Sequence, residues 1–168
     1  NGRQVALVNC QGNVGVHTGS RCIIHASHLT GKNYAVQANS MAKSTVPSAM
    51  VQAFESTTGD LAERMLAALD AAEAEGGDLR GRQSAAMLVV SGEPTGDSWT
   101  DRIVDLDVAD HENPLIELRR LYRIVRPTVT PKRVMNIWKR TKWIVPCRNT
   151  LLIRNYTQKT RNCLFGPQ

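Results

Sequence analysis

The sequence predicts an α+β domain over residues 1–124 and a basic extension over residues 125–168. The opening third alternates short apolar runs with turn residues, which is typical of a strand meander. Two stretches with apolar residues at helical spacing follow, and then two further strand candidates and a last helix. With 168 residues and 42% hydrophobic composition, the chain is long enough for one domain with its own core.

The first third is predicted to form four strands. Gln4–Asn9 is an apolar run, residues 11–13 have turn chemistry and residues 14–18 alternate, which together predict a hairpin. Arg21–Ala26 is the third candidate because it is rich in residues that favour strands. Tyr34–Gln37 is the fourth, after a Gly-Lys-Asn turn.

Two helices are predicted next, followed by two strands and a third helix. The first helix starts near Pro47, and the second starts after Asp60, a good N-cap, and ends at the Gly-Gly pair of residues 76–77. Two strands come after them. Ser84–Val90 is a compact run of small and β-branched residues, and Arg102–Val108 alternates apolar and acidic residues.

The last predicted helix begins with Asn113 as its cap and Pro114 in its first turn. Beyond it the character of the chain changes. From Asn1 to Ile124 all fifteen acidic residues outnumber eleven Lys and Arg, whereas the stretch from Val125 onward has ten Lys or Arg and no acid. The net charge of +6 is therefore a property of the tail.

Basic residues interleaved with an aromatic ring in this tail predict contacts with phosphates and bases. The candidate nucleic-acid contacts are Lys139, Arg140, Lys142 and Trp143. Two alternatives stay open. The tail is an extension that binds a protein partner, or it is the translation of a shifted frame or an unspliced exon end.

No run of eighteen or more apolar residues and no signal-peptide pattern occurs in the sequence, so a soluble cytoplasmic protein without membrane contacts is expected. The four cysteines lack metal-binding spacing and no cofactor motif is present, so neither a metal nor a cofactor is predicted. His25 and His28 have H-x-x-H spacing, but on a strand this spacing directs the rings to opposite faces.

Several strings of the sequence are shared with one known family. The most specific is residues 76–86 (GGDLRGRQSAA). The others include Arg3-Gln4-Val5, Thr18-Gly19, His28, Val36-Gln37-Ala38-Asn39 and Pro114-Leu115-Ile116-Glu117-Leu118. On these strings, residues 3–124 resemble the N-terminal-nucleophile (Ntn) hydrolase-like domain of unknown function 1028.

The resemblance implies a four-layer αββα sandwich that is incomplete at the N-terminus of this chain. In Ntn hydrolases a Thr, Ser or Cys at the mature N-terminus attacks an amide carbonyl, with its own amino group as base. Asn1 cannot do this, because a carboxamide is no nucleophile. The resemblance therefore implies a small amide-containing substrate for full-length members, and it predicts that this chain, without a catalytic residue of its own, is inactive.

Five residues are candidates for a pocket. Gln37 and Asn39 lie two apart at a strand end, so both amides can donate to an oxyanion or a substrate carbonyl, and the alternative is a pair of turn-capping amides. Asp78, Arg80 and Gln83 lie in a loop between a helix and a strand, a usual place for site residues. The alternative there is that Asp78 and Arg80 only satisfy each other and the loop backbone.

Three functions stay open at this point. The first is an Ntn-type amide hydrolase of which this chain is an inactive part. The second is a non-catalytic binding or assembly module, such as a homo-oligomer, because a sheet without its first strands has open edges. The third is nucleic-acid binding through the tail.

Overall fold

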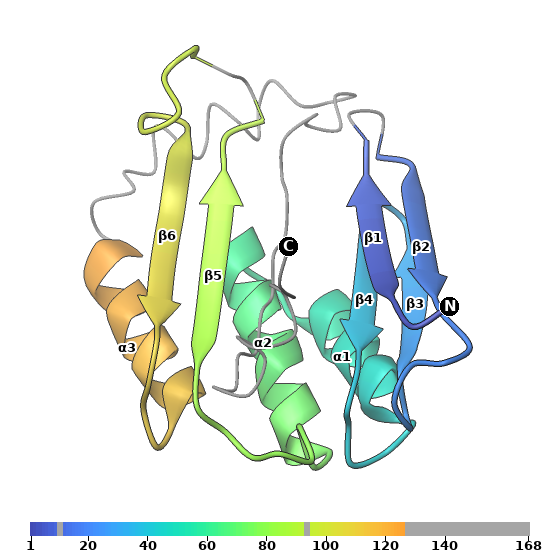
Figure 1. Ribbon diagram of the computed structural model, residues 1–168. Coiled ribbons are helices and arrows are strands. Elements are labelled where there is room, and N and C mark those ends of the chain that lie inside the picture. Colours follow the sequence, from blue (N-terminus) through green and yellow to red (C-terminus); the bar gives the residue numbers. More distant parts are fainter. Residues whose placement is uncertain (10–11, 93–94, 127–168) are drawn as a thin grey trace, which may run out of the picture.

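The computed structural model describes residues 1–9, 12–92 and 95–126, which form six strands and three helices (Figure 1). The strands are β1 (Gln4–Val8), β2 (Val14–Thr18), β3 (Ser27–Gly31), β4 (Tyr34–Ala38), β5 (Ala85–Val90) and β6 (Arg102–Val108). The helices are α1 (Val46–Ser56), α2 (Leu61–Ala74) and α3 (Pro114–Val125). This mixed content confirms the predicted α+β class.

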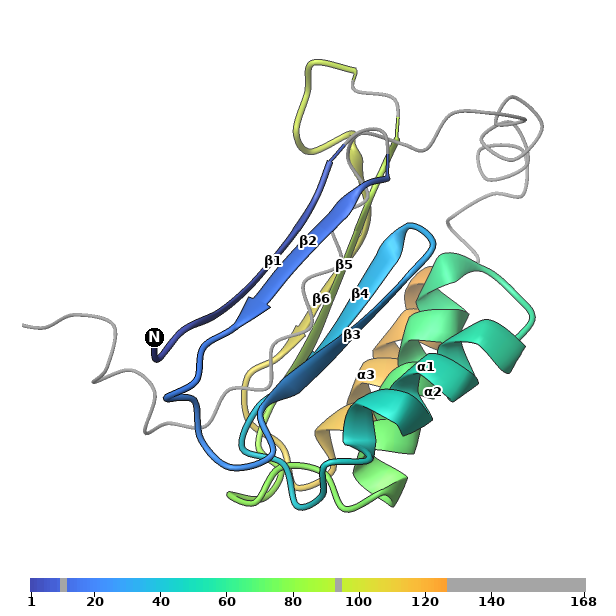
Figure 2. The same cartoon turned by 90° about the vertical axis from the view of Figure 1, so that its right-hand side faces the viewer.

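The described strands pair as three antiparallel two-stranded sheets, β1–β2, β3–β4 and β5–β6. The β3–β4 and β5–β6 pairs lie in one layer (Figure 1). The β1–β2 hairpin lies over β3–β4 as a second strand layer, and the three helices cover the opposite side (Figure 2). The described residues thus form one helical layer and two strand layers.

The core lies between the helices and the strand layer that they cover. Along β5 and β6 alternate residues face this core, which is why Met87 and Val104 are buried while their strand neighbours stay partly exposed. Met65, Leu66 and Leu118 supply the helical side and are exposed by no more than 1%. Burial of an apolar side chain of this size contributes about 1.5–3 kcal/mol.

Both ends of α2 are defined by local hydrogen bonds. Asp60 caps the N-terminus by accepting a hydrogen bond of 2.9 Å from the backbone N–H three residues later. At the other end, the N–H of Gly77 donates to Ala72 O (2.9 Å) and that of Gly76 to Glu73 O (3.1 Å), the two bonds of a Schellman motif. The predicted cap and glycine end are confirmed.

One predicted strand is wrong. Residues 21–26 form turns, in which His25 has a left-handed φ of 58°, and the third strand is formed by the next five residues instead. Ile23 and Ile24 are 60% and 65% exposed, so their preference for strands is not backed by burial. Pairing with β4 decides which residues become the strand.

The predicted start of the last helix is confirmed, because Asn113 is the N-cap residue and Pro114 lies in the first turn, but Asn113 makes no side-chain capping bond to α3. Its Oδ1 accepts a hydrogen bond from Arg82 at 3.3 Å, and its own N–H donates to Nδ1 of His111 at 2.9 Å. A search of the described residues finds no helix long and apolar enough to cross a membrane.

Candidate functional site

The loop between α2 and β5 is held against the end of β4. Met41 and Asp78 form an antiparallel bridge, and Leu79 N donates to Ser40 O at 2.8 Å. The chain enters this bridge directly after the C-terminal end of α2. The pairing places the predicted loop residues next to the segment that contains Asn39, so the structure brings these two parts of the predicted site together.

Asp78 and Arg80 satisfy each other. Asp78 accepts bonds from the backbone N (2.8 Å), Nε (2.9 Å) and Nη2 (2.6 Å) of Arg80. The Asp78 side chain is only 4% exposed, whereas that of Arg80 is 36% exposed. The hydrogen bond to Asp78 raises the pKa of the Arg80 guanidinium. This pair shapes the loop. The arrangement agrees with the alternative in which Asp78 and Arg80 satisfy each other and the loop backbone.

A small cavity lies beneath this loop, with a volume of about 30 Å³. Asp78 and Gln83 line it together with Ser84, while Gln37, Asn39 and Arg80 do not. Ligand pockets usually have volumes of about 300–1,000 Å³, whereas a water needs only about 10–15 Å³ measured in this way. The cavity therefore fits water and is too small for an amide substrate.

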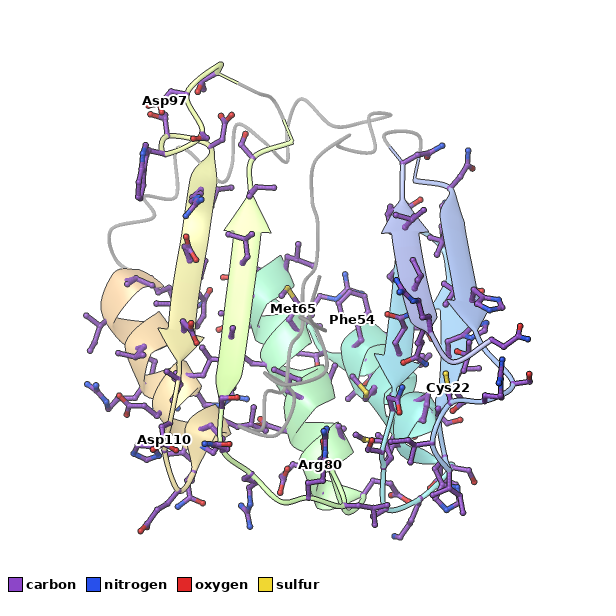
Figure 3. All side chains as sticks on the ribbon, in the orientation of Figure 1. Cys22, Phe54, Met65, Arg80, Asp97 and Asp110 are labelled. Carbon is purple, nitrogen blue, oxygen red and sulfur yellow. The ribbon has the colours of Figure 1, made fainter. Side chains whose placement is uncertain are left out.

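Arg80 marks the end of the molecule at which these parts meet. Figure 3 shows Arg80 at the same end as Asp110, with Asp97 at the opposite end. The bridge to the segment after β4 puts the end of that strand here as well.

Four polar side chains lie between the two strand layers near this end, and we call them the inter-layer site: Gln4, Thr18, His28 and Gln37. They form two cross-strand pairs, because Gln4 lies opposite Thr18 in the β1–β2 sheet and His28 lies opposite Gln37 in the β3–β4 sheet. Thr18 Oγ1 and His28 Nδ1 are 2.7 Å apart, which connects the two layers. The hairpin registers thus place one polar pair against the other.

Gln4 makes most of the connection between the layers. Its Nε2 lies within hydrogen-bond distance of Thr18 Oγ1 (2.9 Å), Ser27 O (3.0 Å) and Ala38 O (3.1 Å). An amide nitrogen has two hydrogens, so one of them is shared between two acceptors. This single side chain from β1 therefore joins its own hairpin to both strands of the second layer.

The hydrogen bonds leave one ring nitrogen of His28 outside the contact with Thr18. Thr18 accepts from Gln4 and still has its hydroxyl hydrogen to donate to Nδ1 of the imidazole. In the tautomer in which Nδ1 accepts this hydrogen, the ring proton is on Nε2.

Gln37 differs from the other three members of the inter-layer site. Its Nε2 is buried and has no hydrogen-bond partner among the residues that the structure describes. Buried polar groups are nearly always paired, and an unpaired one costs about 1–3 kcal/mol. The arrangement leaves a donor between the strand layers that is available to an oxygen atom of a ligand.

Sequence reasoning found Gln37 and its neighbour Asn39 but missed Gln4, Thr18 and His28 as partners. Asn39 Oδ1 is 3.4 Å from Ser40 Oγ, so its amide takes part in the turn after β4. The missed residues had one signal in the sequence, because Gln4 and Thr18 are polar residues at inward-facing positions of otherwise apolar strands.

Two further expectations concern metals and nucleic acid. In residues 1–9, 12–92 and 95–126, no group of three or more His, Cys, Asp or Glu side chains is arranged to hold a metal ion. The proposed nucleic-acid contacts, Lys139, Arg140, Lys142 and Trp143, lie outside the described residues. Nucleic-acid binding through the tail stays a prediction. It predicts salt-sensitive binding of RNA or DNA that is lost when residues 125–168 are deleted.

Comparison with known proteins finds a matching family and a similar solved structure. The model of a family described as "Family of unknown function (DUF1028)" matches residues 1–118. Among solved structures, the crystal structure of protein SPO2555 from Silicibacter pomeroyi, which carries the same family label, is similar with a TM-score of 0.61 at 27% sequence identity. The match covers 89% of this chain and 62% of that chain. No curated protein matches.

Proposed function

The chain belongs to the DUF1028 family of unknown function, and from that membership we propose that it is the substrate-holding part of an Ntn-type, amide-cleaving protein. The observation that carries the proposal is the buried Nε2 of Gln37, for which the described residues offer no acceptor. A donor held in a water-poor site between two strand layers can bind a substrate oxygen more strongly than the same donor in water.

The proposed architecture is a four-layer αββα sandwich. The two strand layers and the helical layer of this chain supply three of the four layers (Figure 2). The chain spans 62% of the solved relative's length. In the proposal, the second helical layer and an attacking Thr, Ser or Cys with its free amino group belong to the remaining part.

Each candidate residue has a distinct role in this proposal. Gln37 donates to an oxygen of the substrate, and Asn39 lines the approach where β4 meets the loop that follows α2. Asp78 and Arg80 fix that loop through their mutual bonds, and Gln83 lines the water-sized cavity beneath it. In the proposal, Gln37 and Asn39 bind and orient a substrate without attacking it, so the 168-residue chain by itself has no turnover.

The test compares two forms of the protein on a panel of small amides. A longer polypeptide with the attacking segment joined ahead of this chain is expected to hydrolyse at least one amide, and the 168-residue chain none. Replacement of the attacking residue by Ala removes the activity, and Gln37→Met lowers it, whereas the exposed Gln52→Met on α1 does not. Turnover by the short chain, or turnover that does not depend on the attacking residue, would overturn the proposal.

A second candidate function is assembly into a homo-oligomer. Each of the six described strands pairs with a single neighbour, so each has one edge without a ladder among the described residues. Open edges favour pairing with another copy of the chain. Sedimentation is expected to show a concentration-dependent dimer or larger species, and a stable monomer at high protein concentration would exclude this candidate.

A further inference from the structure

We propose that His28 and Gln37 form a binding site for a carboxylate group, and that the ligand of the inter-layer site is a small molecule carrying such a group. The two residues are cross-strand partners on β3 and β4. Side chains that lie directly opposite in an antiparallel pair have Cβ atoms about 4.5–5.5 Å apart on the same face of the sheet. Their donors can therefore reach the two oxygens of one carboxylate.

Both side chains present an N–H group. The contact with Thr18 occupies Nδ1 of His28, and in the proposed site Nδ1 accepts from the Thr18 hydroxyl while Nε2 carries the ring proton. The Nε2 amide of Gln37 is buried with no acceptor in the described part of the chain. Hydrogen bonds to an ionised acceptor are roughly twice as strong as neutral ones, so a carboxylate gains more from this pair of donors than an uncharged group does.

The comparison with Gln4 shows that Gln37 is not a second structural amide. Both are glutamines at the same inter-layer site, and Nε2 of Gln4 has three protein acceptors. Nε2 of Gln37 has none within the described residues. One amide therefore joins the layers, and the other presents its donor to a ligand.

The charge of this half of the molecule favours an anion. No Asp or Glu precedes Glu55 in the sequence, so strands β1 to β4 contain no carboxylate at all. The charged side chains of that stretch are Arg3, Arg21, Lys32 and Lys43. A surface with one sign of charge attracts ligands of the opposite sign, and the strands offer no carboxylate of their own to compete for the two donors.

The route to the site follows from the way in which the hairpin is attached. The β1–β2 sheet shares no backbone ladder with the other described strands, and side-chain hydrogen bonds of Gln4 and Thr18 join it to the second strand layer. A two-stranded hairpin attached through side chains opens at a lower free energy than the whole domain unfolds. Local opening at these contacts gives a ligand access to Gln37.

This inference deepens the proposed function, and it rests on that proposal only where it names the substrate. If the protein cleaves amides, the carboxylate is the group by which the substrate is held, and the substrate is a small amide that also carries a carboxylate. Carboxylate binding by this chain requires no cleavage and is measured separately.

The experiment titrates the 168-residue chain with N-acetylglycine and with its uncharged analogue N-acetylglycinamide, following side-chain and backbone amide signals by NMR. We expect N-acetylglycine to shift the Gln37 side-chain signal and to bind at least about tenfold more tightly than N-acetylglycinamide. Gln37→Met and His28→Phe each weaken its binding by about tenfold, since each removes one donor to a charged group.

Matched controls separate the site from the rest of the surface. Gln52→Met on α1 and His17→Phe on the outer face of β2 change the same residue types at exposed positions, and they leave the binding of N-acetylglycine unchanged. Equal affinity for the two probes, or unaltered binding in both site variants, would overturn the inference.

The outcome for the proposed function is read independently. Selective binding of N-acetylglycine, together with a longer polypeptide that cleaves no amide, supports the carboxylate site and overturns the proposed function. Cleavage of uncharged amides by that polypeptide, without carboxylate-selective binding, supports the proposed function and overturns the inference.

Discussion

The hydroxyl of Tyr122 on α3 donates to Oδ2 of Asp60 at 2.6 Å, and Oδ1 of the same carboxylate accepts the capping bond at the start of α2. One carboxylate therefore fixes the beginning of one helix and the position of another. Burial, and then the hydrogen bond to Asp60, raise the pKa of the Tyr122 phenol. This contact holds α3 against the start of α2.

Tyr122→Phe is expected to lower the free energy of unfolding by about 1–2 kcal/mol, because a partly buried hydrogen bond to a charged acceptor is lost. Tyr34→Phe is the control, since Tyr34 donates to Glu55 in the same way (2.6 Å) but is less buried than Tyr122. Its effect on urea unfolding should be smaller. Equal losses in the two variants would contradict the role of burial.

The same two tyrosines predict a loss of stability in alkaline solution. Burial, and then the bond to Glu55, raise the pKa of Tyr34 to about 12 from its ordinary value of 10.0, and the pKa of Tyr122 is also raised. Each tyrosine stabilises the folded protein fully at pH values below its pKa in the unfolded chain. This stabilisation is lost as the pH rises through its pKa in the folded protein. Stability should therefore fall with rising pH above about 10, and the slope should be smaller in the variant with both tyrosines changed to Phe. Urea unfolding at several pH values measures the slope.

Gln37→Met is expected to leave the free energy of unfolding unchanged or to raise it by up to about 1 kcal/mol, although most substitutions of inward-facing residues destabilise. The reason is that the change removes a buried donor that has no acceptor among the described residues. Gln4→Met is the opposite case, because it deletes three hydrogen-bond contacts, and it should destabilise. A clear loss of stability in Gln37→Met would show that its amide has a structural partner.

Arg80→Ala is expected to cost about 1–3 kcal/mol, because it deprives the nearly buried Asp78 carboxylate of its two side-chain donors. Arg120→Ala provides the control. Arg120 donates to Glu117 with the same two-pronged geometry (2.8 and 2.7 Å), but both side chains are more exposed, and its loss should cost less than about 1 kcal/mol. Chemical denaturation of both variants measures the loss in free energy of unfolding. Similar losses in the two variants would count against the buried state of Asp78.

Gly77→Ala tests the turn that leads into the loop. Gly77 has a φ of +61°, and a Cβ atom there would meet Oε2 of Glu73 at 2.7 Å. A loss of about 1–2 kcal/mol is expected, because a left-handed conformation is unfavourable for alanine. Gly15 in β2 has open space around it and no left-handed φ, so Gly15→Ala should be neutral or slightly stabilising. Thermal unfolding of the two variants provides the comparison.

Local patterns were sufficient to predict the helices and the strands with regular alternation. The boundaries of α2 follow from Asp60 and the glycine pair because capping is decided by neighbours in the sequence. The third strand was predicted six residues too early, because pairing with β4 and not the preference of Ile23 and Ile24 determines its position.

The inter-layer site could not be predicted from such patterns. The contact of Thr18 with His28 requires the register of two hairpins and the stacking of one on the other, and none of these is a local property. Asp78 and Arg80 are two residues apart in the sequence, so both could be predicted as candidates, and their mutual bonding could be predicted as the alternative. The unpaired amide of Gln37 becomes visible only in three dimensions.

The attachment of the β1–β2 hairpin through side chains has a consequence for the divergence of related proteins. Within the described residues no main-chain ladder fixes the angle of this hairpin, so substitutions at Gln4 or Thr18 can shift it without disturbing the fold of either neighbour. Relatives with other residues at these two positions can therefore hold the hairpin at a different angle on the same framework. The most informative positions for comparing such relatives are the few polar residues where the hairpin rests.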